Sequence, residues 1–155
     1  MSRNTDTDRD TTKQDSLLQQ ADSSQPALNY SVSLQRAAAS VGFDWPDSAG
    51  VIAKIKEELD EVVAEINSAD PERLRDEIGD LLFAVTNLAR HVNVDPEHAL
   101  RNSIDKFYRR FNYIERQFHP LNKTPDQCDL SALDELWDEA KLAERDITPP
   151  QKSRP

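Results

Sequence analysis

Two short acidic segments stand out because their spacing places carboxylates on one side of a helix. Glu58 and Glu61 lie within Glu57-Glu58-Leu59-Asp60-Glu61, and Glu77 and Asp80 lie within Glu77-Ile78-Gly79-Asp80. At ~100° per residue, positions i and i+3 lie roughly 60° apart around a helix. Each pair also borders the apolar stripe of its own segment. Four converging carboxylates repel unless a divalent cation neutralises them, and oxygen-only ligands favour magnesium or manganese.

A second explanation of the acidic segments stays open, since Glu and Asp runs also form solvated helix faces. In that case Lys54 and Lys56 would support them as i,i+4 partners. Gly79 favours a site, because a mid-helix glycine costs about 1 kcal/mol relative to alanine. Close approach of another helix or of a ligand would explain this glycine, and plain helix packing would explain it too.

Basic residues flank the apolar stripe of a later segment, where Lys106 and Arg110 are one helical turn apart. A metal on one side and a Lys/Arg pair on the other suit a polyphosphate, whose charge both neutralise. The alternative is a pair of surface cations that bind Asp105 or Glu115. Lys54, one turn before Glu58, has the same two interpretations. Trp137 offers a face for a base, although a half-buried tryptophan is usually part of a core.

The composition excludes several classes of protein. The chain has 155 residues, the size of one domain with one core, and a net charge of −10, which argues against wrapping a nucleic-acid polymer. Three glycines cannot form a glycine-rich phosphate loop, and one cysteine cannot form a disulfide framework within the chain. No signal peptide or membrane-spanning run is visible, so we expect a cytoplasmic protein without a membrane partner.

Apolar residues recur at three- and four-residue spacing from residue 33 onward, which predicts an all-α fold. Start signals at Ser48, Asp70-Pro71 and Asp95-Pro96 predict three long helices, flanked by helices at about 33–41 and 131–145. The short connections indicate an antiparallel bundle of four to five helices over residues 30–145. Residues 1–29 and 146–155 are polar or proline-rich, which predicts disordered tails.

The ordered set of motifs is similar to one family. It comprises Leu34-Gln35-Arg36-Ala37-Ala38, Gly42-Phe43-Asp44-Trp45-Pro46, the two acidic segments, Gly79-Asp80-Leu81-Leu82-Phe83, Lys106-Phe107-x-x-Arg110-Phe111, and Leu133-x-x-Leu136-Trp137. In this order and spacing they resemble MazG-type nucleoside triphosphate pyrophosphohydrolases of the all-α NTP pyrophosphatase superfamily. The resemblance covers about residues 33–145 and is greatest to the C-terminal copy of the tandem domains in the longer MazG proteins.

The resemblance implies hydrolysis of a nucleoside triphosphate to monophosphate and pyrophosphate, by water that a magnesium ion activates. It implies metal ligation by Glu58, Glu61, Glu77 and Asp80, with manganese as a substitute for magnesium. Lys106, Arg110 and also Lys54 would contact the phosphates. Trp137 would lie near the nucleotide. Glu57 matches an acid of the motif whose role stays open. The pairing of domains in the family implies a homodimer, and the rival function is a catalytically silent acidic interaction module.

Overall fold

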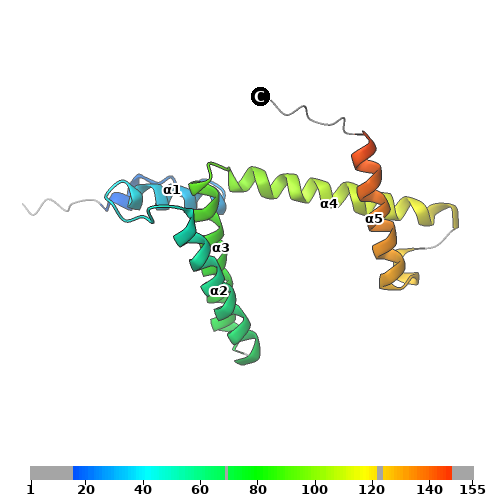
Figure 1. Ribbon diagram of the computed structural model, residues 1–155, viewed down its shortest axis with the longest axis horizontal. Coiled ribbons are helices and arrows are strands. Elements are labelled where there is room, and N and C mark those ends of the chain that lie inside the picture. Colours follow the sequence, from blue (N-terminus) through cyan, green and yellow to red (C-terminus); the bar gives the residue numbers. More distant parts are fainter. Residues whose placement is uncertain (1–15, 69, 122–123, 148–155) are drawn as a thin grey trace, which may run out of the picture. The chain divides into compact units, whose positions relative to one another are not determined.

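The computed structural model describes residues 16–68, 70–121 and 124–147 (Figure 1). Within these ranges every element is helical, so the predicted all-α class is confirmed. The α-helices are α1 (Ala27–Ala39), α2 (Ser48–Ser68), α3 (Pro71–His91), α4 (Pro96–Phe118) and α5 (Leu130–Ile147), and three short 3-10 helices accompany them. The length predicts one core, whereas the contacts divide the chain into two compact units that meet between Glu97 and His98. Each unit is described by itself.

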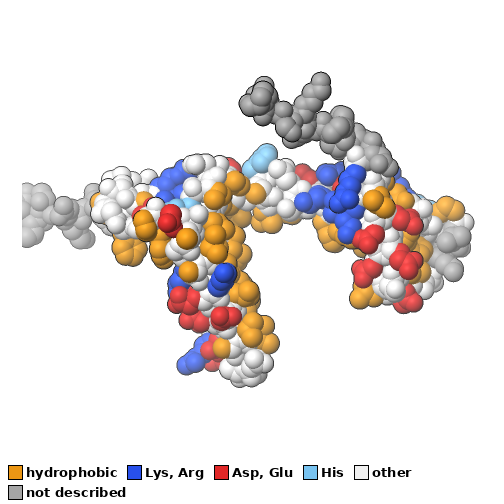
Figure 2. Space-filling model, in the orientation of Figure 1, with side chains coloured by type: hydrophobic (Ala, Val, Ile, Leu, Met, Phe, Trp, Pro, Cys, Tyr) orange, Lys and Arg blue, Asp and Glu red, His pale blue; other side chains and the backbone are white. Residues whose placement is uncertain are grey.

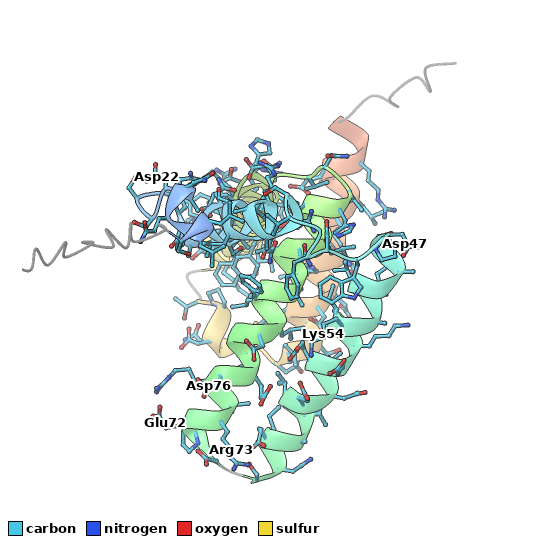
Figure 3. The ribbon with its side chains drawn as sticks, turned by 90° about the vertical axis from the view of Figure 1, so that its left-hand side faces the viewer. Asp22, Asp47, Lys54, Glu72, Arg73 and Asp76 are labelled. Carbon is cyan, nitrogen blue, oxygen red and sulfur yellow. The ribbon has the colours of Figure 1, made fainter. Side chains whose placement is uncertain are left out.

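Helices α2 and α3 form an antiparallel hairpin, in which they lie side by side (Figures 1 and 3). The predicted start of α3 is confirmed, because the Asp70 carboxylate accepts hydrogen bonds from the backbone N–H groups of Glu72 and Arg73. At α2 the cap lies one residue before the predicted Ser48: Asp47 Oδ1 accepts from Ala49 N at 2.8 Å. Val51, Val62 and Ala84 are buried between the elements of this unit. The hairpin therefore brings its two acidic segments together.

Helix α1 packs against α3 and begins earlier than predicted, at Ala27 instead of near residue 33. Val32 is buried, and Ser31 Oγ donates to Thr86 Oγ1 at 2.7 Å, which ties α1 to α3. The 3-10 helix η1 (Leu17–Gln20) lies against α1. Residues 16–29 thus differ from the predicted disordered tail, because tertiary contacts order a segment whose own composition is polar. Residues 1–15, the rest of that prediction, lie outside the described residues.

The second unit contains most of α4 together with α5. Helix α4 begins at the predicted Pro96, and α5 extends the predicted range by one residue at the start and two at the end. Ile114, Phe118 and Ala140 are buried, and the rings of Phe107 and Trp137 lie 5.5 Å apart. The predicted C-terminal tail overlaps α5 at residues 146–147, and its remainder lies outside the description.

Large apolar side chains are exposed along one edge of the hairpin, where the first unit itself does not cover them (Figure 2). The predicted stripes are thus only half buried. On α2 the exposed members are Ile52, Leu59, Val63 and Ile66, and on α3 they are Ile78, Leu82 and Val85. Of the helices in the described ranges, none combines the length and the apolarity that a membrane span requires.

Candidate metal centre

Three carboxylates of the hairpin meet at one point between α2 and α3. Glu58 from α2 and Glu77 and Asp80 from α3 each offer an oxygen, and these oxygens all lie within 4.8 Å of one another. Glu58 is buried, Glu77 is half-buried and Asp80 is exposed. Carboxylate oxygens at this separation could hold a hard divalent cation.

The buried member of this set shows why a cation fits. Only 4% of Glu58 is exposed, and its Oε2 is buried without a hydrogen-bond partner. Its other oxygen, Oε1, lies 2.6 Å from Lys54 Nζ. A buried carboxylate oxygen without a partner is costly, since most buried polar atoms in proteins are hydrogen-bonded. A cation at the meeting point of the three acids would supply the missing partner.

Glu61, the fourth predicted ligand, lies one turn along α2 from Glu58. The pKa of Glu61 is raised above its ordinary value, first by the hydrogen bond between its carboxyl and that of Glu58, then by desolvation. The negative charges of Glu58 and Glu77 raise this pKa further. Glu61 therefore belongs to the same crowded acidic region, although the group of three within 4.8 Å does not include it.

Lys54 pairs with two acids of its own helix. Its Nζ lies 2.9 Å from Glu57 Oε1 and 2.6 Å from Glu58 Oε1, and these contacts hold the lysine pKa above its usual range. This is the i,i+4 pairing that the sequence offered as the alternative to a phosphate contact. Glu57 is itself largely exposed, with 58% of its side chain accessible. In the structure, therefore, Lys54 orients Glu58 towards the acidic cluster.

Gly79 lies between Glu77 and Asp80 but makes no close approach within the described residues. A Cβ built on Gly79 would have no heavy atom of the described residues within 4 Å, so no other helix of the first unit approaches it closely. Gly50 behaves differently, since its Cβ would lie 2.2 Å from Trp45 Cδ1. The glycine that the sequence singled out thus has open space, and the glycine that the fold requires is Gly50.

A cavity of about 330 Å³ opens beside the acidic cluster. Its walls include Lys54, Glu58 and Asp80 together with Trp45, Phe83 and Asn87. Figure 3 labels Lys54 where α2 and α3 run side by side. The cavity can hold a small charged ligand next to a bound cation, with an aromatic wall at its other end.

An ion-pair cluster that no sequence motif predicts fixes the segment before α2. Asp44 accepts hydrogen bonds from the Arg90 guanidinium, with Nη1 at 2.9 Å, and His91 Nε2 lies 3.0 Å from Asp44 Oδ1. These contacts, led by that from Arg90, lower the Asp44 pKa to about 2. The sequence shows the acid Asp44 between Phe43 and Trp45, and it shows Arg90 and His91 at the end of α3. Their spacing in the sequence does not indicate that these residues form ion pairs.

In the second unit the predicted cation Arg110 sits between an acid and an aromatic ring. Arg110 Nε donates to Glu144 Oε2 at 2.8 Å, and the guanidinium carbon lies 5.6 Å from the centroid of the Trp137 ring. Arg109 Nε donates to the other oxygen of Glu144 at 3.1 Å. Lys106 is exposed on the same helix. Arg110 and Trp137 are thus together, and the acids form a separate group in the first unit.

Comparisons with known proteins match this chain to one protein family. Residues 47–114 match the profile of the MazG nucleotide pyrophosphohydrolase domain. The chain is 43% identical over 116 residues to the nucleoside triphosphate pyrophosphohydrolase/pyrophosphatase MazG of Thermotoga maritima, which covers 75% of this chain and 44% of that protein. It is 40% identical over 136 residues to the nucleoside triphosphate pyrophosphohydrolase of Escherichia coli K12, covering 86% and 52% respectively.

A shorter match is to the uncharacterized protein YabN of Bacillus subtilis. It is 44% identical over 72 residues, which cover 46% of this chain and 15% of that protein. The chain spans about half the length of the two pyrophosphohydrolases that it matches. All the residues that form the acidic cluster lie inside the matched range of 47–114.

Proposed function

Because the chain carries a MazG nucleotide pyrophosphohydrolase domain, we propose that it hydrolyses nucleoside triphosphates to nucleoside monophosphate and pyrophosphate. One observation of the structure carries this proposal. The oxygens of Glu58, Glu77 and Asp80 lie within 4.8 Å of one another beside a cavity large enough for part of a nucleotide. The chain covers only about half the length of each of these two relatives. The activity of those whole proteins is therefore proposed for this chain.

We propose that Glu58, Glu61, Glu77 and Asp80 hold a divalent cation, magnesium or in its place manganese. The buried Glu58 Oε2 without a partner and the raised pKa of Glu61 support this assignment. A cation held by these residues would supply Lewis-acid chemistry, since it would neutralise phosphate charge and activate a water molecule. Lys54 keeps the Glu58 carboxylate in place through its contact with Oε1. Glu57 is the second partner of Lys54. Its part in catalysis stays a prediction, with its role still open.

Lys106, Arg110 and Trp137 have proposed roles in binding the substrate. A guanidinium neutralises charge on phosphate oxygens and donates two parallel hydrogen bonds to them. Glu144 engages Arg110 through Nε. Lys106 would add a second positive charge one turn away on α4, and Trp137 would lie beside the nucleotide. Lys54 would also contact the phosphates, and for this a bound substrate would have to displace its ammonium group from Glu57.

The experiment that tests the proposed function is a panel of ribo- and deoxyribonucleoside triphosphates, assayed separately for released pyrophosphate and orthophosphate. With millimolar magnesium we expect pyrophosphate from at least one nucleotide, and excess EDTA should abolish the release. A chain that binds nucleotide but releases neither product would instead match the rival function, a catalytically silent interaction module. Release of orthophosphate alone would contradict the proposed cleavage position.

We also propose a homodimer in which two hairpins pack together. Leu59, Val63 and Ile66 of α2 are each at least half exposed and follow a four- and three-residue spacing. Exposed apolar patches of this kind mark interfaces, and two antiparallel hairpins that pack on such stripes form a four-helix bundle. Leu82 on α3 is similarly exposed at 53%.

Sedimentation velocity tests the dimer. Val63→Glu should convert the protein to a monomer, because a carboxylate cannot be buried in the interface without a partner. The matched control is Ala64→Glu, which adds the same charge to an exposed position next along α2, off the apolar stripe. A monomeric wild-type protein would contradict the proposal. The cytoplasmic location and the absence of nucleic-acid polymer and membrane partners stay predictions.

A further inference from the structure

A second cavity shares walls with the one beside the acidic cluster. It measures about 270 Å³, and Trp45, Phe83 and Asn87 line both cavities. Its remaining walls are mostly apolar and come from η1, α1 and the segment before α2, with Leu18, Leu34 and Phe43 among them. One continuous region of the first unit therefore has a charged end and an apolar, aromatic end.

The Trp45 ring is held from two sides. Gly50 allows the ring to lie against the first turn of α2, because a Cβ at that position would be 2.2 Å from Trp45 Cδ1. The Trp45 backbone N–H donates to Asp44 Oδ1 at 2.9 Å, and Asp44 in turn pairs with Arg90 and His91 at the end of α3. The Arg90 and His91 side chains are 12% and 11% exposed, so this clamp is largely shielded from water.

Two carboxamides in the walls complete the polar groups of this second cavity. Asn87 is buried, and its Oδ1 accepts from Arg90 Nε at 2.9 Å, so its amino group is the donor that it can offer a ligand. Gln35 donates from Nε2 to the Phe83 carbonyl at 2.9 Å and to Thr86 Oγ1, while its Oε1 is buried without a partner. A donor and an acceptor among aromatic side chains match a flat heterocycle with mixed hydrogen-bonding edges.

We propose that this aromatic cavity binds the base of the nucleotide whose phosphates lie at the acidic cluster. Trp45 is its stacking wall, and Asp44 is a positioning residue that acts through Trp45. The proposal rests on the proposed nucleotide substrate, and it places base recognition on residues of α1, α3 and the segment that joins α1 to α2. The continuity of the two cavities through Trp45, Phe83 and Asn87 is what connects base to phosphate.

Calorimetric titration with two ligands separates this base site from the phosphate site. One ligand is the magnesium complex of an α,β-methylene nucleoside triphosphate, chosen for the base that turns over fastest, and the other is magnesium tripolyphosphate, which has no base. Trp45→Ala should weaken nucleotide binding about 10-fold, since stacking one base on an aromatic ring contributes about 1–3 kcal/mol. Binding of tripolyphosphate should stay within about 2-fold of wild type, because its contacts are electrostatic.

Further variants keep the test independent of any loss of folding in Trp45→Ala. Trp45→Phe should retain most of the nucleotide affinity, and Gly50→Ala, which forces the ring aside, should lose it. Asp44→Asn should lower the ratio of nucleotide to tripolyphosphate affinity by about 3-fold, a change in selectivity that general destabilisation would not produce. The matched control is Val41→Ala, an exposed residue of the same segment that lines neither cavity.

The outcomes distinguish the two proposals. Equal losses for both ligands in Trp45→Ala and Gly50→Ala, or no loss for either, would overturn the base site while leaving hydrolysis and the metal centre standing. Failure of the wild-type protein to bind the nucleotide analogue would overturn the proposed function as well.

Discussion

The two units of the chain differ in how their charged side chains are grouped: like charges meet in the first, and opposite charges pair in the second. On α2 and α3, Glu58, Glu77 and Asp80 bring oxygens of like charge within 4.8 Å. On α4 and α5, by contrast, Arg110 and Arg109 share the Glu144 carboxylate, and Arg110 also faces the Trp137 ring. In the second arrangement, positive side chains neutralise the carboxylate. In the first, the three carboxylates carry more negative charge than Lys54 neutralises. A region that gathers uncompensated charge is suited to bind a ligand of the opposite sign, at the expense of stability without it.

The largest effect should come from removing one charge of the acidic cluster. Asp80→Asn should lower kcat/KM at least ~100-fold, because positioning of the metal and charge stabilisation are lost together. Glu58→Gln should do the same. Stability should be unchanged or higher in Asp80→Asn, since a repulsive charge is removed. Steady-state pyrophosphate release and thermal melting measure both effects.

The matched control for that substitution is Asp76→Asn, an exposed acid one turn before Asp80 on α3 and outside the cluster. It should retain wild-type kinetics. Equal losses in Asp76→Asn and Asp80→Asn would mean that general surface charge, and not the cluster, matters for turnover.

A smaller effect is expected from the cations of the second unit. Arg110→Ala should lower kcat/KM by about 10-fold or more, and Arg110→Lys should not restore it, because lysine lacks the planar fork that grips two oxygens. Lys106→Ala should act in the same direction with an unchanged melting temperature, since Lys106 is exposed. Arg109→Ala removes the other partner of Glu144 and should leave kcat/KM near wild type. Unchanged kinetics in both Arg110→Ala and Lys106→Ala would return these residues to the surface-cation interpretation.

Magnesium should stabilise the protein through the first unit. Millimolar magnesium should raise the melting temperature, with a gain that grows logarithmically above the Kd, and sodium chloride at equal ionic strength should give less. Glu61→Gln should leave the metal-free protein as stable or slightly more stable while it reduces the response to magnesium. If magnesium stabilises wild type and Glu61→Gln equally, Glu61 is not a ligand.

The smallest effect, on pH dependence, should have opposite signs in the two units. The pKa of Glu144 is lowered from 4.5 by Arg110 and, less strongly, by Arg109, so its stabilisation is complete above pH 4.5 and is lost as the pH falls through its folded-state value. The pKa of Glu61 is raised from 4.5 by its acidic neighbours, so stability is lost as the pH rises above 4.5 towards the raised value.

Urea unfolding of the metal-free protein between pH 3 and pH 7 measures these slopes. Glu144→Gln should differ from wild type most at neutral pH, where it should be less stable, and least at pH 3. Glu61→Gln should be the more stable protein at neutral pH, with a difference that vanishes towards pH 3. If the stability difference from wild type changed with pH in the same direction for both variants, the opposite pKa shifts of Glu144 and Glu61 would be contradicted.

The sequence predicted the elements that local signals encode. Asp70 and Pro71 are a cap and a first-turn proline, and α3 begins where they indicate. The three-residue spacing within each acidic segment predicted that four carboxylates converge, and three of them, Glu58, Glu77 and Asp80, lie within 4.8 Å of one another. Helix periodicity and a short connection fix which faces of α2 and α3 meet. These features depend on residues close in sequence.

Features that depend on distant contacts were missed or misplaced. The Asp44–Arg90 pair joins residues 46 positions apart, and no local pattern connects them. Residues 16–29 are polar and were predicted to be a disordered tail, yet η1 packs against α1, and α1, which begins at Ala27, packs against α3. The requirement for Gly50 arises only because the Trp45 ring lies against it, whereas the mid-helix position made Gly79 look significant. Tertiary packing, and not propensity, decided each of these cases.

The central claim is that the acidic cluster of α2 and α3 supports cleavage of a nucleoside triphosphate to monophosphate and pyrophosphate. Phosphorus NMR of one reaction, followed in real time after magnesium is added to the protein and its fastest nucleotide, tests this claim most directly. We predict that pyrophosphate and nucleoside monophosphate signals grow in equal amounts with the wild-type protein. With Asp80→Asn in its place, the spectrum should continue to show only the nucleoside triphosphate. Growth of nucleoside diphosphate and orthophosphate, or equal pyrophosphate from wild type and Asp80→Asn, would contradict it.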